Sequence, residues 1–310
     1  MMLTSFNILI CGSSNITYDH IEAIKKIKEL KISAIYSGNI EKVQKISQKN
    51  NIRIIKDLKK EDLSTFDIAL ITSSTSSHLK YLELLSSDIK NIIVEKPIVC
   101  SNTEFNILKS IKNNKNILFK EVTLFDSFKV NIPLNSLEIK IRKKRALDDY
   151  KNFEDKVDIY KSPIFNHLPH WFEFAYKYLG SDFKIDGVHF EKFDKALNFH
   201  KKIDINLINS KKRLKINLDF SHNKNYKNQL RFNYNNRLIN LLLSPFNILI
   251  NNLPFSSHVN TKNKIPLLES FYRNFLNGLN INNQEEYFKK LENKIILINK
   301  IWEIGMNNKS

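Results

Sequence analysis

The feature that most constrains the fold is a regular alternation of strand and helix patterns before residue 123. Short apolar runs recur as "FNILICG", "ISAIYS", "IRIIKD", "FDIALITSS", "NIIVEKP" and "NILFKEV". Segments with apolar residues near helical spacing, such as "IEKVQKISQKN" and "SNTEFNILKSIKNN", separate them. Strands alternating with helices predict a parallel sheet, and right-handed crossovers make it doubly wound. We therefore expect a doubly wound α/β domain over residues 1–123.

The pattern changes in residues 124–310. Segments such as "NSLEIKIRKKR", "KIDINLI", "RLKINLDFSH" and "RLINLLLSPFNILIN" contain period-two stretches, which are typical of a mostly antiparallel sheet with one covered face. One helical segment, "HLPHWFEFAYKYLG", ends at Gly180, a suitable C-terminal cap. Two further helices are predicted in the tail. We expect an α+β domain with a large open sheet, whose last helices are candidates for packing back on the first domain.

Composition limits the class of protein. A hydrophobic fraction of 42% permits a sizeable core, and no apolar run reaches the roughly 18 to 20 residues that span a bilayer. The start "MMLTSFNILICG" lacks the pattern of a signal peptide. Cys11 and Cys100 have neither metal-ligand nor disulfide spacing, which favours two buried thiols. We expect a soluble, cytoplasmic protein with no membrane partner.

The formal net charge of +17 raises the question of a nucleic-acid partner. The basic residues are scattered along the chain rather than gathered in one arm or helix, and no helix-turn-helix or stacked-aromatic module is recognisable. A solvated basic surface is the first interpretation, and attraction to an anionic small substrate is the second. A nucleic-acid partner is not expected.

The turn after the first predicted strand, "CGSSNIT", is a weakened dinucleotide fingerprint. Of the three glycines of G-x-G-x-x-G only Gly12 is present, with Ser14 and Thr17 in the other places. A helix N-terminus still offers N–H groups to a phosphate, and the hydroxyls add donors. A β-carbon at Ser14 would hold a pyrophosphate farther away. A turn that binds nothing is the alternative.

The second predicted strand ends in "IYSGN", so Ser37 stands where a carboxylate would bind the ribose hydroxyls of NAD. A small polar residue leaves room for a 2′-phosphate, but no arginine follows to bind one. The choice between NAD and NADP stays open, with a lean towards NADP.

The strand pattern "NIIV" ends abruptly in Glu95, Lys96 and Pro97. In an open α/β sheet the carboxyl ends of the strands are where ligands bind. A charged pair followed by proline at this place therefore indicates a functional site, and a plain surface strand end is the alternative.

Taken together, the motifs resemble the Gfo/Idh/MocA oxidoreductase family. Gly12 and His20 fall in register with that family's glycine-rich turn and the histidine that follows it. "TSSTSSH", ending in His78, matches its cofactor-contacting loop, and "EKP" matches its signature intact. His170 stands ten residues before Gly180, as the family's active-site histidine stands before its glycine. The resemblance implies an N-terminal Rossmann domain and a C-terminal mixed domain built on an open sheet.

The resemblance also implies a site. Lys96 would reach the cleft near the nicotinamide and stabilise the reacting oxygen, and His170 would transfer its proton. Asn166 stands where the family has an aspartate, and an amide cannot tune the histidine through charge. No metal is expected, although His167 and His170 lie at i and i+3. The expected cofactor contacts are Gly12, Ser13, Ser14, Ser37, Thr72, Ser73, His78, Glu95 and Lys96.

The resemblance thus implies an NAD(P)-dependent oxidoreductase acting on a sugar, sugar nucleotide or polyol, with cell-surface polysaccharide biosynthesis as a candidate pathway. The substrate would be set by the loops around residues 124–165 and 220–262. The rival prediction is a degenerate relative that binds nucleotide or sugar as a regulator or scaffold. The family also implies a homo-oligomer through the C-terminal sheet, because an exposed sheet face is costly in water.

Overall fold

The chain divides into two compact units, each described here by itself. The first comprises Met1–Ser127 and Lys264–Glu285, and the second comprises Phe128–Asn263 and Glu286–Ser310. Most of the expected substrate loops, 124–165 and 220–262, lie outside the described residues. The computed structural model describes residues 5–114, 117–122, 134, 136–142, 162–194, 199–221, 228–234, 237–244, 247–249, 265–278 and 284–308.

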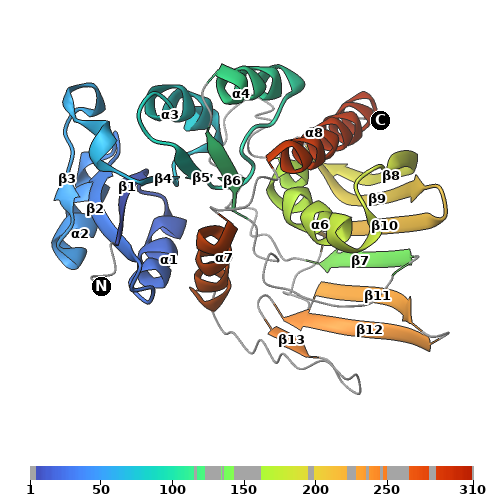
Figure 1. Cartoon of the computed structure of the whole chain (residues 1–310). Helices are drawn as coiled ribbons and strands as arrows, with labels where there is room; N and C mark the ends of the chain where they lie inside the picture. Colours follow the sequence, from blue (N-terminus) through green and yellow to red (C-terminus); the bar gives the residue numbers. More distant parts are fainter. Residues whose placement is uncertain are drawn as a thin grey trace. The chain divides into compact units, whose positions relative to one another are not determined.

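The first unit contains a six-stranded parallel sheet in the order β3-β2-β1-β4-β5-β6 (Figure 1). This order is that of a Rossmann dinucleotide-binding domain, and it confirms the predicted doubly wound sheet. The strands are β1 (Phe6–Cys11), β2 (Leu30–Tyr36), β3 (Arg53–Ile54), β4 (Ile68–Ile71), β5 (Asn91–Val94) and β6 (Leu118–Glu121).

Helices cover both faces of this sheet, so its central strands are buried runs of Ile, Leu, Val and Ala. α1 (Asn15–Ile24), α2 (Ile40–Asn50) and α7 (Ile265–Gly278) pack into one hydrophobic cluster with the sheet. α3 (His78–Leu85) and α4 (Asn102–Asn114) cover the other face. Three short 3₁₀ helices lie in the connections: η1 (Leu58–Lys60), η2 (Leu63–Thr65) and η3 (Thr75–Ser77).

The helix α7 comes from the C-terminal part of the sequence but belongs to the first unit. It lies beside α1 (Figure 1). Its residues Leu268, Phe271, Tyr272 and Phe275 are buried in the same cluster as the sheet residues Ile8 and Ile10 and their neighbours. A segment far away in sequence therefore completes the core of the Rossmann unit.

Two predicted boundaries in the first unit were wrong. The spacing of apolar residues in "TYDHIEAIKKIKEL" predicts one helix through Leu30, but α1 ends at Ile24, and the following strand begins at Leu30 rather than at Ile32. The chain between them forms successive i→i+3 hydrogen bonds, such as Ile27 N–H to Ile24 O and Leu30 N–H to Ile27 O. Ile27 is buried within these tight turns.

The N-terminus of α4 forms a capping box. The Ser101 hydroxyl accepts a hydrogen bond from the Glu104 amide at 3.1 Å, and the Glu104 carboxylate accepts from the amides of Ser101 and Cys100. The cap satisfies three amides that the helix itself leaves without acceptors. The sequence offers Ser101 and Asn102 as candidate caps, with Glu104 in the first turn, and Ser101 is the one used.

The second unit contains a seven-stranded sheet in the order β13-β12-β11-β7-β10-β9-β8. All neighbours are antiparallel except β10 and β7, which confirms the predicted mostly antiparallel sheet. The run "RLINLLLSPFNILIN" forms two strands rather than one. The strands are β7 (Ser136–Arg142), β8 (Lys184–Asp194), β9 (Phe199–Asn209), β10 (Lys212–Asp219), β11 (Asn228–Tyr234), β12 (Arg237–Ser244) and β13 (Asn247–Leu249).

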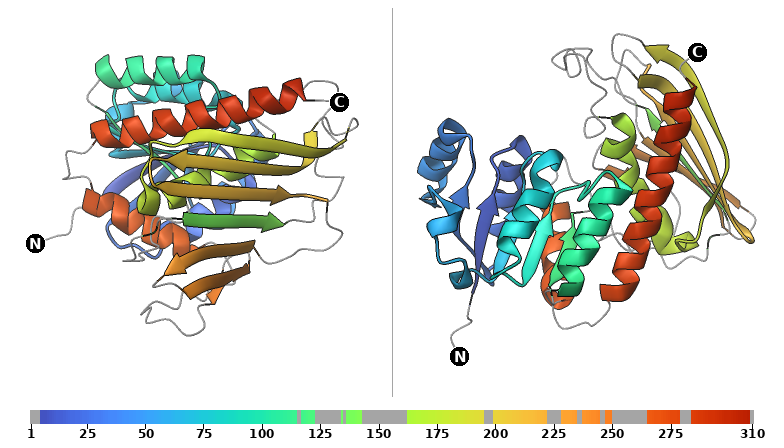
Figure 2. Two further views of the ribbon diagram at one scale, coloured as in Figure 1. Left: turned by 90° about the vertical axis from the view of Figure 1, so that its right-hand side faces the viewer. Right: turned by 90° about the horizontal axis from the view of Figure 1, so that it is seen from above.

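Two helices, α6 (Pro163–Leu179) and α8 (Gln284–Asn307), lie on one face of this sheet (Figure 2). The sheet residues that face them are buried and apolar, as in Ile203, Ile205, Ile216 and Leu218. Alternate residues of β9 and β10 are polar, including Asp204, Asn206, Lys215 and Asn217. The cost of exposing an apolar face therefore does not apply to these strands, and the expected oligomer stays a prediction.

The helix α6 begins one turn earlier than predicted. Ser162 caps it by accepting from the Ile164 amide at 3.2 Å, and Pro163 occupies the first turn, where a missing N–H costs nothing. Pro169 therefore lies inside the helix rather than at its start. The lost hydrogen bond is tolerated because burial of large side chains such as Phe165 and Phe172 holds the helix in place.

Of the helices within the described ranges, none combines the length and apolar character needed to cross a bilayer.

We expect Ser101→Ala to lower the free energy of unfolding by about 1 kcal/mol, because it removes the acceptor for the Glu104 amide. Ser101→Gly should cost only a few tenths of a kcal/mol, because glycine is tolerated at this position. Urea unfolding followed by circular dichroism would compare the two variants. Equal losses would contradict a capping role for the hydroxyl.

Candidate active site

The predicted site residues fall into two groups, one in each unit. The residues expected to bind the cofactor, together with Lys96, belong to the first unit, and Asn166 and His170 belong to the second. Within the first unit they converge because β1, β4 and β5 end level with one another. Cys11 pairs with Ile71, and Ile71 pairs with Val94.

The residue after each of these strands continues the same row. The Thr72 amide donates to the Cys11 carbonyl, and the Glu95 amide donates to the Ile71 carbonyl, each at 2.9 Å. Gly12, Thr72 and Glu95 are consequently neighbours along the carboxyl edge of the sheet. This is the edge at which doubly wound folds bind ligands.

Gly12 makes the close approach between the first turn and the end of β4 possible. Its φ is +140°, a conformation that favours glycine, and a β-carbon there would lie 2.4 Å from the Thr72 carbonyl carbon and 2.5 Å from the Ser73 nitrogen. Both contacts are with backbone atoms, which cannot rotate away. The surviving glycine of the fingerprint is therefore the one that backbone packing requires.

The third fingerprint position holds Thr17, which is completely buried. Its hydroxyl lies 2.8 Å from the Thr72 hydroxyl, so a hydrogen bond joins α1 to the end of β4 where a glycine would give only contact. The second position, Ser14, precedes α1 and is partly exposed. The turn thus keeps its shape with two of its three glycines replaced.

The same turn fits a dinucleotide phosphate. No acidic side chain stands in the first turn of α1, so the positive end of the helix is not neutralised. Ser13 and Ser37 lie side by side with their hydroxyl oxygens 2.9 Å apart, which joins the ends of β1 and β2. Ser37 Oγ also accepts from the Asn39 amide at 3.2 Å. The ribose position at the end of β2 therefore carries hydroxyls and no carboxylate.

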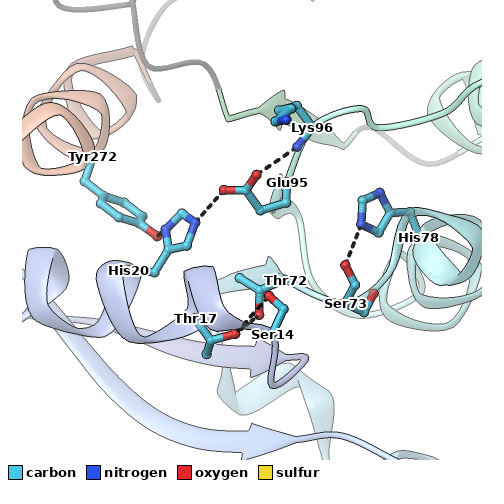
Figure 3. A network of polar contacts seen from close by, with 9 residues as sticks. All are labelled: Ser14, Thr17, His20, Thr72, Ser73, His78, Glu95, Lys96 and Tyr272. Atoms are coloured by element: carbon cyan, nitrogen blue, oxygen red, sulfur yellow. Dashed lines mark hydrogen bonds and ion pairs between the residues drawn. The ribbon is translucent and has the colours of Figure 1, made fainter. Parts of the chain in front are cut away.

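The turn after β5 is held by a buried chain of side chains (Figure 3). His20 Nε2 lies 2.8 Å from Glu95 Oε1, and His20 Nδ1 lies 2.6 Å from the Tyr272 hydroxyl. The second oxygen of Glu95 accepts from the Lys96 amide at 3.1 Å. His20 and Tyr272 are completely buried, and the Glu95 side chain is 13% exposed. The peptide bond between Lys96 and Pro97 is cis.

The environment keeps Glu95 ionised. Burial by itself would raise the pKa of Glu95, but the hydrogen bond from His20, the charge of Lys96 and the hydrogen bond from the Lys96 amide together hold it below its usual 4.5. For Tyr272, burial and then the Glu95 charge raise the pKa well above its usual 10, so its hydroxyl keeps the proton. Burial likewise raises the pKa of the Cys11 thiol, in keeping with a structural residue.

His78 supports the same turn from the α3 side. Its Nδ1 lies 3.0 Å from the Pro97 carbonyl oxygen. Its Nε2 lies 3.2 Å from the Ser73 carbonyl oxygen, a contact drawn in Figure 3. Burial lowers the pKa of His78 below its usual 6.5, and these carbonyls offset the effect in part. Since both ring nitrogens face protein carbonyls, His78 links the β4 loop to the "EKP" turn.

In the second unit, Asn166 and His170 lie on a single partly exposed stripe of α6. The stripe follows helical spacing through Asn166, His170, Glu173 and Lys177, and most of the other described side chains of the helix are buried. His167 is outside the stripe and packs on Phe220, with ring centroids 5.5 Å apart. Among the residues that the structure describes, no three potential ligands converge on a metal position.

Glu173, one turn beyond His170, is engaged with α8. Its carboxylate lies 3.4 Å from the ammonium of Lys294, whose side chain is 3% exposed. A buried ammonium needs such a counter-charge, and the pair therefore fixes α8 against α6.

Sequence reasoning assigned no role to Tyr272, and it noted His20 without placing it in the site. No local pattern marks Tyr272, because its partner is 252 positions away and α7 reads as an ordinary amphipathic helix. The signal for His20 was its register after Gly12. The role of Thr17 as a partner of Thr72 was also missed.

Residues 6–121 match a protein family described as an oxidoreductase family with an NAD-binding Rossmann fold, Gfo/Idh/MocA. The match covers the Rossmann part of the first unit. The Gly12 turn, the loop after β4 and the "EKP" turn all lie within or directly beside the matched residues. Comparison of the whole sequence with curated proteins found no match.

Solved structures extend the likeness in fold to both units. A 3-ketoreductase from Actinomadura kijaniata, solved with NADP and TDP-benzene, is 12% identical with a TM-score of 0.78, covering 97% of this chain and 98% of its own. A putative myo-inositol dehydrogenase from Sinorhizobium meliloti is 12% identical with a TM-score of 0.76, covering 99% and 98%. A UDP-N-acetylglucosamine 3-dehydrogenase from Acidithiobacillus ferrooxidans is 11% identical with a TM-score of 0.74, covering 99% of each chain.

We expect Gly12→Ala to lower the free energy of unfolding by about 3 kcal/mol, because the new β-carbon meets backbone atoms of Thr72 and Ser73 and φ is unfavourable. Gly38→Ala is the matched control, since a β-carbon there meets nothing within 4 Å. Urea unfolding would compare the two. A small effect at Gly12 would mean that the two turns are not packed as described.

Glu95→Gln should lower the free energy of unfolding by about 2 kcal/mol at pH 7, because it removes the charged acceptor of the buried chain. The folded pKa of Glu95 is depressed, so its contribution is present above pH 4.5 and is lost as the pH falls through the folded value. The difference between wild type and variant should therefore shrink below pH 4.5. Glu41→Gln, at an exposed pair with Lys45, should show no such dependence.

Proposed function

We propose that the protein is an NAD(P)-dependent oxidoreductase that transfers hydride to or from a carbinol carbon of a sugar, sugar nucleotide or polyol. The observation that carries the proposal is the level ending of β1, β4 and β5, which sets the Gly12 turn and the "EKP" turn side by side. The N-terminus of α1, which is suited to bind a phosphate, and Lys96 therefore lie at the same edge of the sheet.

The nicotinamide cofactor would supply or accept the hydride. The residues proposed to hold it are Gly12, Ser13, Ser14, Ser37, Thr72, Ser73, Glu95 and Lys96, with His78 bracing the loop that contains Ser73. The N–H groups at the start of α1 and the neighbouring hydroxyls bind the phosphates, and Gly12 lets the turn pack closely enough to present them. Ser37 leaves room for a 2′-phosphate.

Lys96 is the residue proposed to act on the reacting oxygen. When a carbonyl accepts hydride, negative charge develops on its oxygen, and an ammonium that donates a hydrogen bond there lowers the barrier. Glu95, ionised beside it, favours the charged form of the lysine. In the oxidative direction the same ammonium stabilises the alkoxide that precedes hydride loss.

His170 is proposed to transfer the hydroxyl proton, because an imidazole exchanges protons near neutral pH. Asn166 stands one turn before it on the same partly exposed stripe and would bind a substrate hydroxyl. The amide of Asn166 would position that hydroxyl by hydrogen bonding and would add no charge to the site. The roles of the two residues depend on the second unit and are testable separately from that of Lys96.

The substrate class is supported by the neighbours in fold, whose descriptions include a 3-ketoreductase solved with TDP-benzene and a UDP-N-acetylglucosamine 3-dehydrogenase. The net charge of +17 favours an anionic substrate such as a sugar nucleotide. A role in cell-surface polysaccharide biosynthesis follows as part of the proposal. We also propose a homo-oligomer formed through the C-terminal sheet.

A second candidate is a relative that binds nucleotide or sugar as a regulator or scaffold. The replacement of two fingerprint glycines and the amide at Asn166 favour it. The intact and buried support of the "EKP" turn argues against it, since a protein without turnover has no need to hold Lys96 in this way.

A titration of NADH and NADPH into nucleotide-free protein, read by energy transfer from the aromatic residues, separates the two candidates. We expect micromolar binding of at least one, with NADPH the tighter. Ser37→Asp should weaken NADPH binding about tenfold or more by placing a carboxylate beside the 2′-phosphate. Ser37→Ala isolates the loss of the hydroxyl. Absence of binding at millimolar concentration would favour the regulator.

We expect Lys96→Ala to lower kcat on an identified substrate by about 100-fold or more, because the donor to the developing oxyanion is lost. The exposed Lys80→Ala in α3 is the control and should keep full turnover. Wild-type turnover in Lys96→Ala would refute the role given to Lys96.

A further inference from the structure

The buried chain from Tyr272 through His20 to Glu95 has a definite pattern of hydrogen-bond donors and acceptors. Tyr272 is completely buried, and among the residues that the structure describes its hydroxyl makes one hydrogen bond, to His20 Nδ1 at 2.6 Å. A buried hydroxyl proton needs an acceptor. Tyr272 therefore donates to Nδ1, and this nitrogen of His20 carries no proton.

The other ring nitrogen then has its role fixed. His20 Nε2 lies 2.8 Å from Glu95 Oε1, and a carboxylate can only accept. His20 is thus the neutral Nε2–H tautomer, donating to Glu95 while it accepts from Tyr272. The net negative charge of the chain resides on Glu95, at the end next to Lys96.

Glu95 connects the chain of hydrogen bonds to the backbone of Lys96. Its second oxygen accepts from the Lys96 amide at 3.1 Å, so the carboxylate is anchored at both oxygens and the Lys96 peptide is tied to it. Figure 3 shows the chain running from α7 through α1 to the end of β5. Tyr272, His20 and Glu95 can therefore fix the backbone position of Lys96 without contacting a substrate.

We propose that Tyr272 and His20 are positioning residues for Lys96 that act through Glu95. Tyr272 of α7 donates a hydrogen bond to His20, and His20 donates one to Glu95, which holds the "EKP" turn in place. The expected effect on turnover rests on the proposed function of Lys96. The chain itself is a property of the first unit and can be measured without a substrate.

The first measurement is the tautomer of His20, from long-range ¹⁵N–¹H spectra of the imidazole rings of the full chain. The protein has 8 histidines, so the His20 signals are assigned by their absence in His20→Gln. We expect a neutral ring protonated at Nε2. A ring protonated at Nδ1 would remove Tyr272 as the donor and overturn the proposal.

The second measurement is the reactivity of Lys96 towards acetic anhydride as a function of pH, quantified by mass spectrometry. In Glu95→Gln the midpoint of labelling should move to lower pH by about one unit, because the adjacent carboxylate that favours the ammonium is gone. Tyr272→Phe removes only the hydroxyl and should move the midpoint in the same direction by a smaller amount. The exposed Lys42 is the internal reference and should not move.

The matched control is Tyr18→Phe. Tyr18 packs against the same hydrophobic cluster as Tyr272, but its hydroxyl makes no hydrogen bond that the structure records. A merely structural effect of losing a tyrosine hydroxyl from this core would appear in both variants. An equal labelling profile for Lys96 in Tyr272→Phe and Tyr18→Phe would overturn the proposal.

With an identified substrate, Tyr272→Phe should lower kcat about tenfold with KM little changed, the loss expected for one hydrogen bond. Unchanged turnover together with an unmoved labelling profile would reject the positioning role. Full activity of Lys96→Ala would instead reject the proposed function. In that case the tautomer and the labelling profiles would still decide whether the chain holds Lys96.

Discussion

The hydrogen bond between His20 and Glu95 is the interaction on which the candidate site depends. A carboxylate removed from water is stable as an ion only when its oxygens accept hydrogen bonds, and Glu95 meets this requirement with a side chain from α1 and the backbone amide of Lys96. Since Tyr272 holds His20 in turn, three segments separated in sequence are joined at one point. The place where Lys96 leaves the sheet is therefore set by the core behind it.

The glycine turn illustrates how a weakened motif keeps its geometry. Gly12 is present where a β-carbon would clash with the backbone of Thr72 and Ser73. At the third position of the motif, Thr17 replaces glycine and its hydroxyl pairs with that of Thr72. The end of β2 is similarly joined to β1 through Ser13 and Ser37. Hydroxyls thus hold the turn together, which is why a poor match to the glycine pattern is compatible with an intact Rossmann sheet edge.

In the second unit, the candidate residues Asn166 and His170 are among the few side chains of α6 that are partly exposed. In α6 a nearly all-round apolar helix is buried except for the stripe of Asn166, His170, Glu173 and Lys177, so the two predicted residues share the face that retains contact with solvent. The pair of Glu173 with Lys294 ties α8 to this helix beside the stripe. Burial also separates His167 from His170, which periodicity alone had placed on one face.

The sequence by itself determined the order of elements, the doubly wound sheet, the antiparallel second sheet and the positions that mark the site, because period-two and helical patterns, caps and strand-end motifs are local properties. It also singled out Lys96, His78 and Ser101 from their neighbours alone. Only the tertiary structure decided that α7 returns to the first unit, that Tyr272 orients His20, and that His78 lies between the carbonyls of Pro97 and Ser73. Those features depend on contacts across up to 252 positions of chain, and no local pattern encodes which distant hydroxyl or carbonyl a buried ring will meet.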